Sequence, residues 1–144
     1  MTRVGIYGGS GYTGQELIRL LLGHPGVTLA AATSRRFAGV PAAEVYPHFA
    51  GLTELVFTDD SPAAMAEKAD VIFLALPHGI CMDLAPQFTR TGRIVIDLSA
   101  DFRIRDAAVY EAWYGSHRAT GLLEEAVYGL PEIHREAVRR ARFV

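Results

Sequence analysis

The stretch Gly8-Gly9-Ser10-Gly11-Tyr12-Thr13-Gly14 decides the fold that this sequence predicts. A short apolar segment (3–7) precedes it, and a segment with apolar residues at helical spacing (12–22) follows it. Glycine at 8 permits a tight turn, at 11 it lets the backbone approach a pyrophosphate, and at 14 it lets helix and strand pack closely. A plain turn between a strand and a helix is the competing interpretation. The two flanking elements favour a nucleotide-binding turn, with the N–H groups of the helix start facing the phosphates.

Short apolar runs alternate with helix-like segments along the rest of the chain. Strands are expected at 27–33, 55–57, 71–76 and 93–98, and helices at 62–69, 80–88, 107–114 and 132–140. The run 71–76 is apolar throughout, which is typical of a strand buried on both faces, and Pro86 should interrupt its helix near the end. This alternation predicts an α/β fold with a doubly wound, mainly parallel sheet. Such a sheet binds ligands at the carboxyl ends of its strands.

The composition argues against several functional classes. The chain has 144 residues, enough for one domain, and a net charge of −2, which implies no basic face for nucleic acid. No apolar run is long enough for a membrane span, and no signal peptide is recognisable. One cysteine excludes an internal disulfide, and the five histidines lack ligand spacing, so we expect no metal site. We expect a cytoplasmic protein.

The end of the second strand indicates which nucleotide is bound. NAD enzymes usually place an acidic residue there, whereas this chain has Thr33-Ser34-Arg35-Arg36 and no competing Asp or Glu at that position. A guanidinium and a hydroxyl suit a 2′-phosphate, so we expect NADP(H), although a solvated basic turn would look the same. His78 is as readily an ordinary loop histidine as a cofactor contact. The predicted cofactor site comprises Gly8, Ser10, Gly11, Tyr12, Thr13, Gly14, Ser34, Arg35, Leu76, Pro77, His78 and Ser99.

Three later segments narrow the choice of protein family. They are Leu76-Pro77-His78-Gly79, Asp97-Leu98-Ser99-Ala100-Asp101-Phe102-Arg103 and Tyr128-Gly129-Leu130-Pro131-Glu132. Together with the glycine loop and the Ser34-Arg35 pair, they resemble the N-acetyl-gamma-glutamyl-phosphate reductase family of arginine biosynthesis, from about Arg3 to the last residue. The aspartate-semialdehyde dehydrogenases are similar in fold and chemistry but lack the last two segments. A lysine-pathway reductase of aminoadipyl phosphate is a closer alternative. A non-catalytic nucleotide-binding module is an alternative of another class.

The resemblance implies a Rossmann-type domain and a reaction. In the family a cysteine thiolate attacks an acyl phosphate, phosphate leaves, and hydride from NADPH yields a semialdehyde, with a histidine as acid and base. The nucleophile is expected beyond Val144, so we expect 1–144 to be the NADP-binding fragment of a two-domain, homo-oligomeric enzyme without its catalytic and dimerisation domain. No catalytic residue is therefore expected in this chain. Residues 142–144 resemble the start of the strand that leads to the missing segment. Cys81 does not match the family's cysteine and is expected to be a small apolar residue.

Arg103 is the candidate contact to the substrate's phosphate. It follows Ser99 at the carboxyl end of a predicted strand, similar reductases place an arginine there, and a planar guanidinium can bind two phosphate oxygens. The alternative is a surface ion pair of Arg103 or Arg105 with Asp101 or Asp106. Asp97 and Asp101 are expected to be a strand-end cap and an ion-pair partner.

Overall fold

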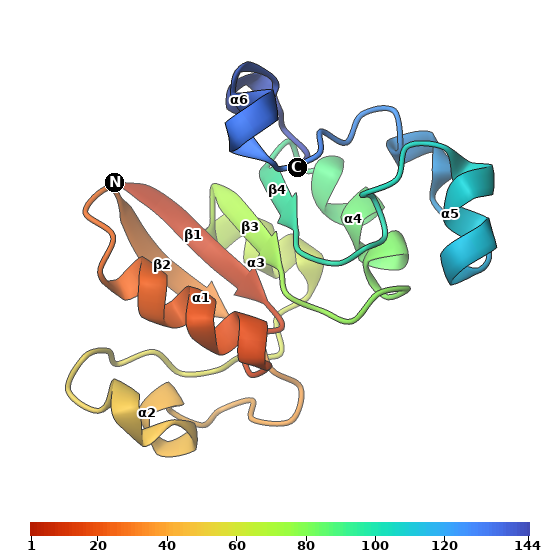
Figure 1. Cartoon of the computed structure of the whole chain (residues 1–144). Helices are drawn as coiled ribbons and strands as arrows, with labels where there is room; N and C mark the ends of the chain where they lie inside the picture. The colour runs from red at the N-terminus through yellow and green to blue at the C-terminus, as the bar shows by residue number, and fades with distance from the viewer.

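A parallel sheet of four strands forms the centre of the protein in the computed structural model, which describes all residues from Met1 to Val144 (Figure 1). The strands β1 (Thr2–Tyr7), β2 (Val27–Ala32), β3 (Val71–Leu74) and β4 (Ile94–Asp97) lie in the order β2-β1-β3-β4. All three strand pairings are parallel. The chain therefore reverses its direction of travel across the sheet between β1 and β3, and the carboxyl ends there form the crevice where such sheets bind ligands. The predicted doubly wound α/β fold is confirmed.

Helices cover the two faces of the sheet unequally. Helix α1 (Tyr12–Leu22) lies on one face, over β1 and β2, while α3 (Pro62–Lys68) and α4 (Cys81–Thr89) lie on the other (Figure 1). Each face has its own buried apolar cluster. The α1 side contains Ile6, Ile18, Phe49 and Phe57, and the α3/α4 side contains Met65, Ile72, Leu74, Phe88 and Val95. The side chains of β1 alternate between these clusters, which fixes its register relative to both layers.

The C-terminal part contains α5 (Ala107–Tyr114), a 3₁₀ turn at Thr120–Leu122 and α6 (Pro131–Arg140). Residues 142–144 then run beside β4, because Val95 N donates to the Arg142 carbonyl at 2.8 Å and Val144 N donates to the Val95 carbonyl at 2.9 Å. The expected start of a further strand is thus confirmed as a parallel bridge of Val95 with Phe143. The C-terminus lies next to β4 (Figure 1). No helix combines the length and the apolarity that a membrane crossing requires.

Three expectations about the elements were wrong. Residues 55–57 form no strand, only a bridge of Val56 with Pro41, and the preceding stretch contains α2 (Ala42–Val45) and a 3₁₀ turn at Pro47–Phe49. The expected strand 71–76 ends at Leu74 and is fully buried on one face only, because α1 lies over β1 and β2 rather than β3. Helix α4 continues through Pro86 to Thr89, since proline this close to the helix end removes a single backbone donor.

Candidate functional site

The glycine loop after β1 is tied to the end of β2. Gly9 N donates to the carbonyl of Thr33 at 2.7 Å, and Gly8 N donates to the hydroxyl of Thr33 at 3.0 Å. Thr33 is buried, so these two bonds are shielded from water and fix the loop against the sheet. Thr33 was not among the predicted site residues, because the basic residues that follow it were the stronger signal. Its position at a strand end directly across from the loop was the available signal.

Gly14 and Gly11 are required for different reasons. A Cβ atom at Gly14 would lie 2.6 Å from Cα of Gly9 and 2.7 Å from its carbonyl carbon, so the helix can approach the loop only with glycine there. A Cβ atom at Gly11 would have only the Gly8 carbonyl oxygen near it, at 4.0 Å. The protein itself therefore does not demand glycine at 11. The space beside its backbone is open to a ligand, and it suits the pyrophosphate of a dinucleotide.

The first turn of α1 has unused backbone donors. The first helical hydrogen bond runs from Gln15 N to the Gly11 carbonyl at 2.8 Å, and no side chain caps the helix. The N–H groups of Gly11, Tyr12 and Thr13 have no acceptor in the protein. Such groups, at the positive end of the helix dipole, attract an anion. No acidic side chain lies in the first turn to compete with that anion.

Hydroxyl groups hold the adjoining turn together. The Ser10 and Ser34 side-chain oxygens lie 2.7 Å apart, and Phe37 N donates to the Ser34 hydroxyl at 3.2 Å. The Tyr46 hydroxyl donates to the Ser10 carbonyl at 2.6 Å. Ser34 is buried, so its hydroxyl is already engaged within the protein. Tyr46 was missed because it lies between the expected strands 27–33 and 55–57, where no helix or strand was predicted.

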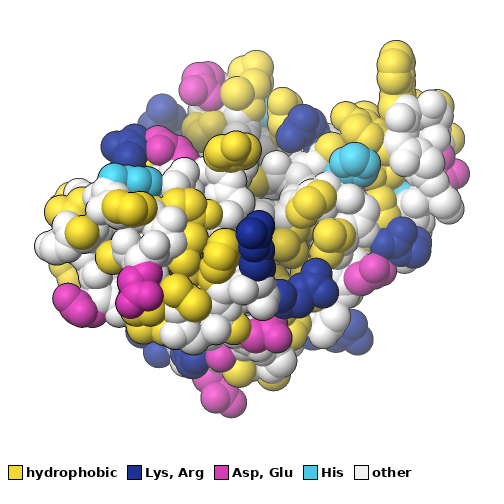
Figure 2. Space-filling view, turned by 90° about the horizontal axis from the view of Figure 1, so that it is seen from below, with side chains coloured by type: hydrophobic (Ala, Val, Ile, Leu, Met, Phe, Trp, Pro, Cys, Tyr) yellow, Lys and Arg dark blue, Asp and Glu magenta, His cyan; other side chains and the backbone are white.

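These parts open into one pocket of about 410 Å³ at the carboxyl ends of β1, β2 and β3. Figure 2 shows this side of the molecule, with Lys and Arg side chains gathered near the middle of the face beside a hollow with hydrophobic walls. Of the predicted cofactor residues, the pocket is lined by Gly8, Ser10, Gly11, Ser34, Arg35, Leu76 and Pro77. Tyr12, Thr13 and Gly14 lie in the first turn of α1 next to it. His78 is exposed, with its ring centroid 6.1 Å from that of Tyr114, and does not line the pocket.

The charged groups of the pocket differ from expectation in one respect. Arg35 and Arg36 are exposed, Arg35 forms no ion pair, and the Arg36 guanidinium lies 5.0 Å from the centroid of the Phe37 ring. Asp59 also lines the pocket, so the pocket contains an acid even though none stands at the end of β2. It comes from a different segment, which linear sequence could not place there. Burial raises the pKa of Tyr7. The negative charge of Asp59 raises this pKa further, and the positive charge of Arg35 lowers it.

Ser99 and Arg103 belong to a second pocket, of about 190 Å³, at the end of β4. Arg103 Nη2 donates to the Ser99 carbonyl at 3.3 Å, and the alternative ion pairs with Asp101 or Asp106 do not form. Asp97 accepts from Ser99 N at 2.9 Å and from its hydroxyl at 2.8 Å, as expected of a strand-end cap. The expectation for Asp101 was wrong, because it pairs with no cation and instead accepts from a backbone N–H and a phenol.

Cys81 has the features of a packing residue. It is completely buried at the start of α4, and its burial, with the charge of Asp97 adding to the effect, raises the pKa of the thiol. Burial likewise raises the pKa of Asp97. A thiol held in its neutral form is a poor nucleophile. The structure gives Cys81 none of the electropositive surroundings that an attacking thiolate needs.

The sequence of residues 3–141 matches the family described as semialdehyde dehydrogenase, NAD binding domain. This chain belongs to that family. It is therefore a domain for a nicotinamide cofactor, and the free N–H groups of α1 and the open backbone at Gly11 are where the structure fits the pyrophosphate of such a group.

Curated relatives align with the whole domain. It is 51% identical over 145 residues to the N-acetyl-gamma-glutamyl-phosphate reductase of Nitrosococcus oceani, covering 100% of this chain and 42% of the relative. It is 46% identical over 143 residues to the [LysW]-L-2-aminoadipate/[LysW]-L-glutamate phosphate reductase of Saccharolobus solfataricus, covering 99% and 41%. The domain thus spans about two fifths of the length of these relatives.

Solved structures share the fold. The aspartate semialdehyde dehydrogenase with NADP from Candida albicans matches 74% of the domain and 32% of its own chain, with a TM-score of 0.63 and 23% identity. Aspartate semialdehyde dehydrogenase II from Vibrio cholerae matches 100% of the domain and 37% of its own chain, with a TM-score of 0.62 and 15% identity. At these identities the likeness concerns the fold.

Proposed function

We propose that this chain is the NADP(H)-binding domain of an N-acetyl-gamma-glutamyl-phosphate reductase. The observation that carries the proposal is that the glycine loop, the start of α1 and Arg35 open into a single pocket. The relatives that are about half identical over the whole domain have this name, which supports the choice of substrate. The bound nicotinamide would supply the hydride that reduces an acyl phosphate to a semialdehyde, with release of phosphate.

The pocket divides into three regions that suit the three parts of the cofactor. The N–H groups at the start of α1 would hold the pyrophosphate, next to the open backbone of Gly11. Arg35, at the end of β2, would bind the 2′-phosphate. Leu76, Pro77 and Ile80, at the end of β3, give an apolar wall that suits the nicotinamide half. Orientation of the cofactor thus follows from the order β2-β1-β3 of the strands.

The preference for NADP(H) over NAD(H) rests on the two charges at one end of the pocket. Arg35 has no acidic partner, so its guanidinium is free for a phosphate, whereas Asp59 in the same wall would repel one. We infer that Arg35 dominates, because its planar group bonds two oxygens while Asp59 acts through the charge alone. Calorimetric titration of the domain with NADPH and with NADH tests this. Equal affinities for the two would refute the preference.

Arg103 is proposed as the contact to the substrate's phosphate. Its guanidinium makes a single hydrogen bond, the long one to the Ser99 carbonyl, it forms no ion pair, and it lines the second pocket. In the longer enzyme, Arg103→Lys keeps the charge but loses the two-pronged geometry, so kcat/KM for the acyl phosphate should fall strongly while NADPH affinity stays unchanged. Arg105→Lys, two residues away, is the matched control. A kcat/KM for Arg103→Lys within about twofold of the parent's would leave Arg103 as a surface residue.

A second candidate is the lysine-pathway reaction, because the relative from Saccharolobus solfataricus is almost as similar as the arginine-pathway ones. Assaying the full-length enzyme with N-acetyl-gamma-glutamyl phosphate and with the carrier-bound aminoadipyl phosphate separates them. Reduction of neither would favour a nucleotide-binding module without chemistry. A homo-oligomeric enzyme in the cytoplasm is part of the proposal, and sedimentation and cell fractionation test those two points.

A further inference from the structure

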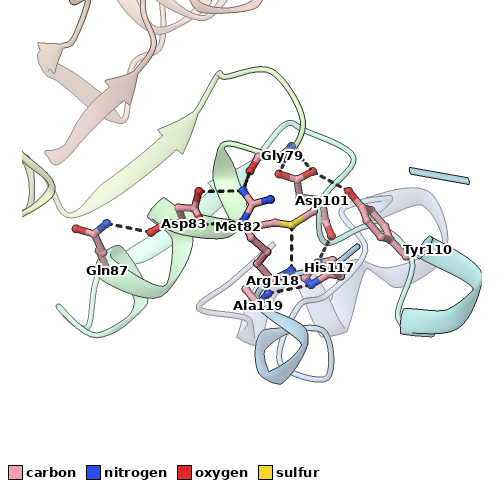
Figure 3. Close-up of polar contacts among 9 residues, drawn as sticks. All are labelled: Gly79, Met82, Asp83, Gln87, Asp101, Tyr110, His117, Arg118 and Ala119. Atoms are coloured by element: carbon pink, nitrogen blue, oxygen red, sulfur yellow. Dashed lines mark hydrogen bonds and ion pairs between the residues drawn. The ribbon is translucent and has the colours of Figure 1, made fainter. Parts of the chain in front are cut away.

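The peptide groups on either side of Gly79 are both held by side chains. Gly79 N donates to both carboxylate oxygens of Asp101, at 2.7 and 2.8 Å, and Arg118 Nη2 donates to the Gly79 carbonyl at 2.5 Å (Figure 3). Arg118 is itself paired with Asp83 at 2.9 Å. Gly79 has a φ of +85°, a conformation that L side chains rarely adopt. This turn is thus fixed by contacts from segments more than twenty residues away in sequence.

Asp101 is an unusual residue for this task, because its carboxylate is completely buried and no cation pairs with it. The Tyr110 hydroxyl donates to it at 3.0 Å, and burial together with the Asp101 carboxylate raises the pKa of Tyr110 to about 12. Tyr110 is therefore a protonated donor at neutral pH. Burying a carboxylate without a cation in contact is costly, and the hydrogen bonds from Gly79 N and the Tyr110 hydroxyl offset that cost. Asp101 therefore links the Gly79 turn to α5.

The backbone of Asp101 is as firmly held as its side chain. His117 Nε2 lies 2.7 Å from the Asp101 carbonyl, and Ala119 N donates to His117 Nδ1 at 3.1 Å. Since Nδ1 accepts, Nε2 has the proton and donates to Asp101. His117 is buried, with its ring packed edge-on against those of Phe102 and Tyr110. The carboxylate therefore has a fixed position from which to hold Gly79.

The held turn belongs to a wall of the cofactor pocket. Leu76, Pro77 and Ile80 line that pocket, and Gly79 joins them within the same short loop. We propose that Asp101 is a positioning residue, which sets the conformation of loop 76–80 and thereby the wall that takes the nicotinamide half of the cofactor. Asp101 does not line the pocket and acts through Gly79. The inference rests on the proposed binding of NADP(H).

The test uses Asp101→Asn, with Asp106→Asn as the matched control. Asp106 makes the same kind of contact, accepting from Ala108 N at 2.9 Å and from Val109 N at 3.1 Å, but it caps α5 and does not touch the loop. Asparagine at 101 replaces one acceptor oxygen by a donor that faces Gly79 N. The Kd for NADPH should rise about tenfold or more, while the Kd for adenosine 2′,5′-bisphosphate, which lacks the nicotinamide half, should not change. Exchange of the Gly79 amide hydrogen should also become about tenfold faster. Asp106→Asn should change none of the three.

The outcomes separate the possible failures. If Asp101→Asn weakens both ligands equally, or neither, the carboxylate does not position the nicotinamide wall. A parent domain that binds neither ligand refutes the cofactor proposal and this inference together. A parent that binds both, with an unchanged Gly79 exchange rate in the variant, refutes this inference alone. If Asp101→Asn does not fold, Tyr110→Phe removes one donor to the carboxylate, and it should raise the Kd for NADPH about threefold without affecting the bisphosphate. Equal Kd values for Tyr110→Phe and the parent would then overturn the proposal.

Discussion

Gly11 and Gly14 allow a prediction in which one variant loses affinity for the ligand and the other loses stability. In Gly11→Ala the new Cβ meets only the Gly8 carbonyl oxygen, at 4.0 Å, and the backbone at φ −85° and ψ 171° is ordinary for any residue. We expect stability within about 1 kcal/mol of the parent, since alanine is only a poorer N-cap than glycine. The pocket, however, is lined by this residue, so the methyl group should keep the pyrophosphate from the N–H groups of α1.

In Gly14→Ala the same methyl group would lie 2.6 Å from Cα of Gly9, against backbone that cannot rotate away. The helix must then move off the loop. Such overpacking costs about 1–3 kcal/mol, which exceeds the gain of about 1 kcal/mol from replacing a helical glycine. For a domain of this size the Tm should fall by about 2–4 °C for each kcal/mol lost.

Thermal unfolding and calorimetric titration of both variants with NADPH check this pair. Gly11→Ala should keep its Tm and lose about tenfold or more in affinity, an effect of at least about 1.4 kcal/mol. Gly14→Ala should have a lower Tm. Its affinity for NADPH should fall only to the extent that the start of α1 is displaced. Unchanged NADPH affinity in Gly11→Ala would refute the reasoning, because it would mean that no ligand approaches the backbone at that position.

Three further variants or reagents probe other parts of the domain. Arg35→Ala should weaken NADPH binding by about 1.5–3 kcal/mol and leave NADH binding unchanged, which titration of both cofactors would show. Cys81 should react with a thiol reagent on the order of a hundredfold more slowly in the native domain than in denaturant, because burial raises its pKa and blocks access, and equal rates would contradict this. The pKa of Asp70 is lowered to about 2 by its hydrogen bonds to Arg3, so this pair stabilises the fold above the ordinary value of 3.8 and ceases to do so as pH falls toward 2. Asp70→Asn should accordingly lower the Tm at pH 7 but not at pH 2, as a pH series of melting curves would show.

The elements with strong local signals were predictable from the sequence. The range 12–22 for α1 is correct, and Ser61-Pro62 marks the start of α3 because the serine hydroxyl accepts from Ala64 N at 3.3 Å. These features depend on neighbouring residues, as do the glycine spacing and the strand that precedes it. Local pattern therefore sufficed for the fold and for the placement of the glycine loop between β1 and α1.

The features that depend on distant contacts were not predictable. Asp59 enters the pocket from the segment between the expected strand 55–57 and α3, and Tyr46 reaches Ser10 across more than thirty residues. Asp101 looked like a surface ion-pair partner because an isolated acid in sequence is usually solvated. Its burial and its contact with Gly79, on which its proposed role rests, appear only in the folded chain. No local periodicity encodes such pairings.

At this edge of the sheet, hydrogen bonds between segments that are distant in sequence hold the walls of the pocket. Two of the loops that leave the carboxyl ends of strands are each fastened by a polar side chain that follows a neighbouring strand. Thr33, after β2, holds the loop after β1, and Asp101, after β4, holds the loop after β3. Adjacent strands in a parallel sheet end at the same edge, so the side chain after one strand is well placed to accept from the loop after the next. A substitution at Asp101 should therefore change the pocket through a loop, whereas Thr33 both lines the pocket and holds a loop. The residues that shape the proposed cofactor site thus extend beyond those that line it.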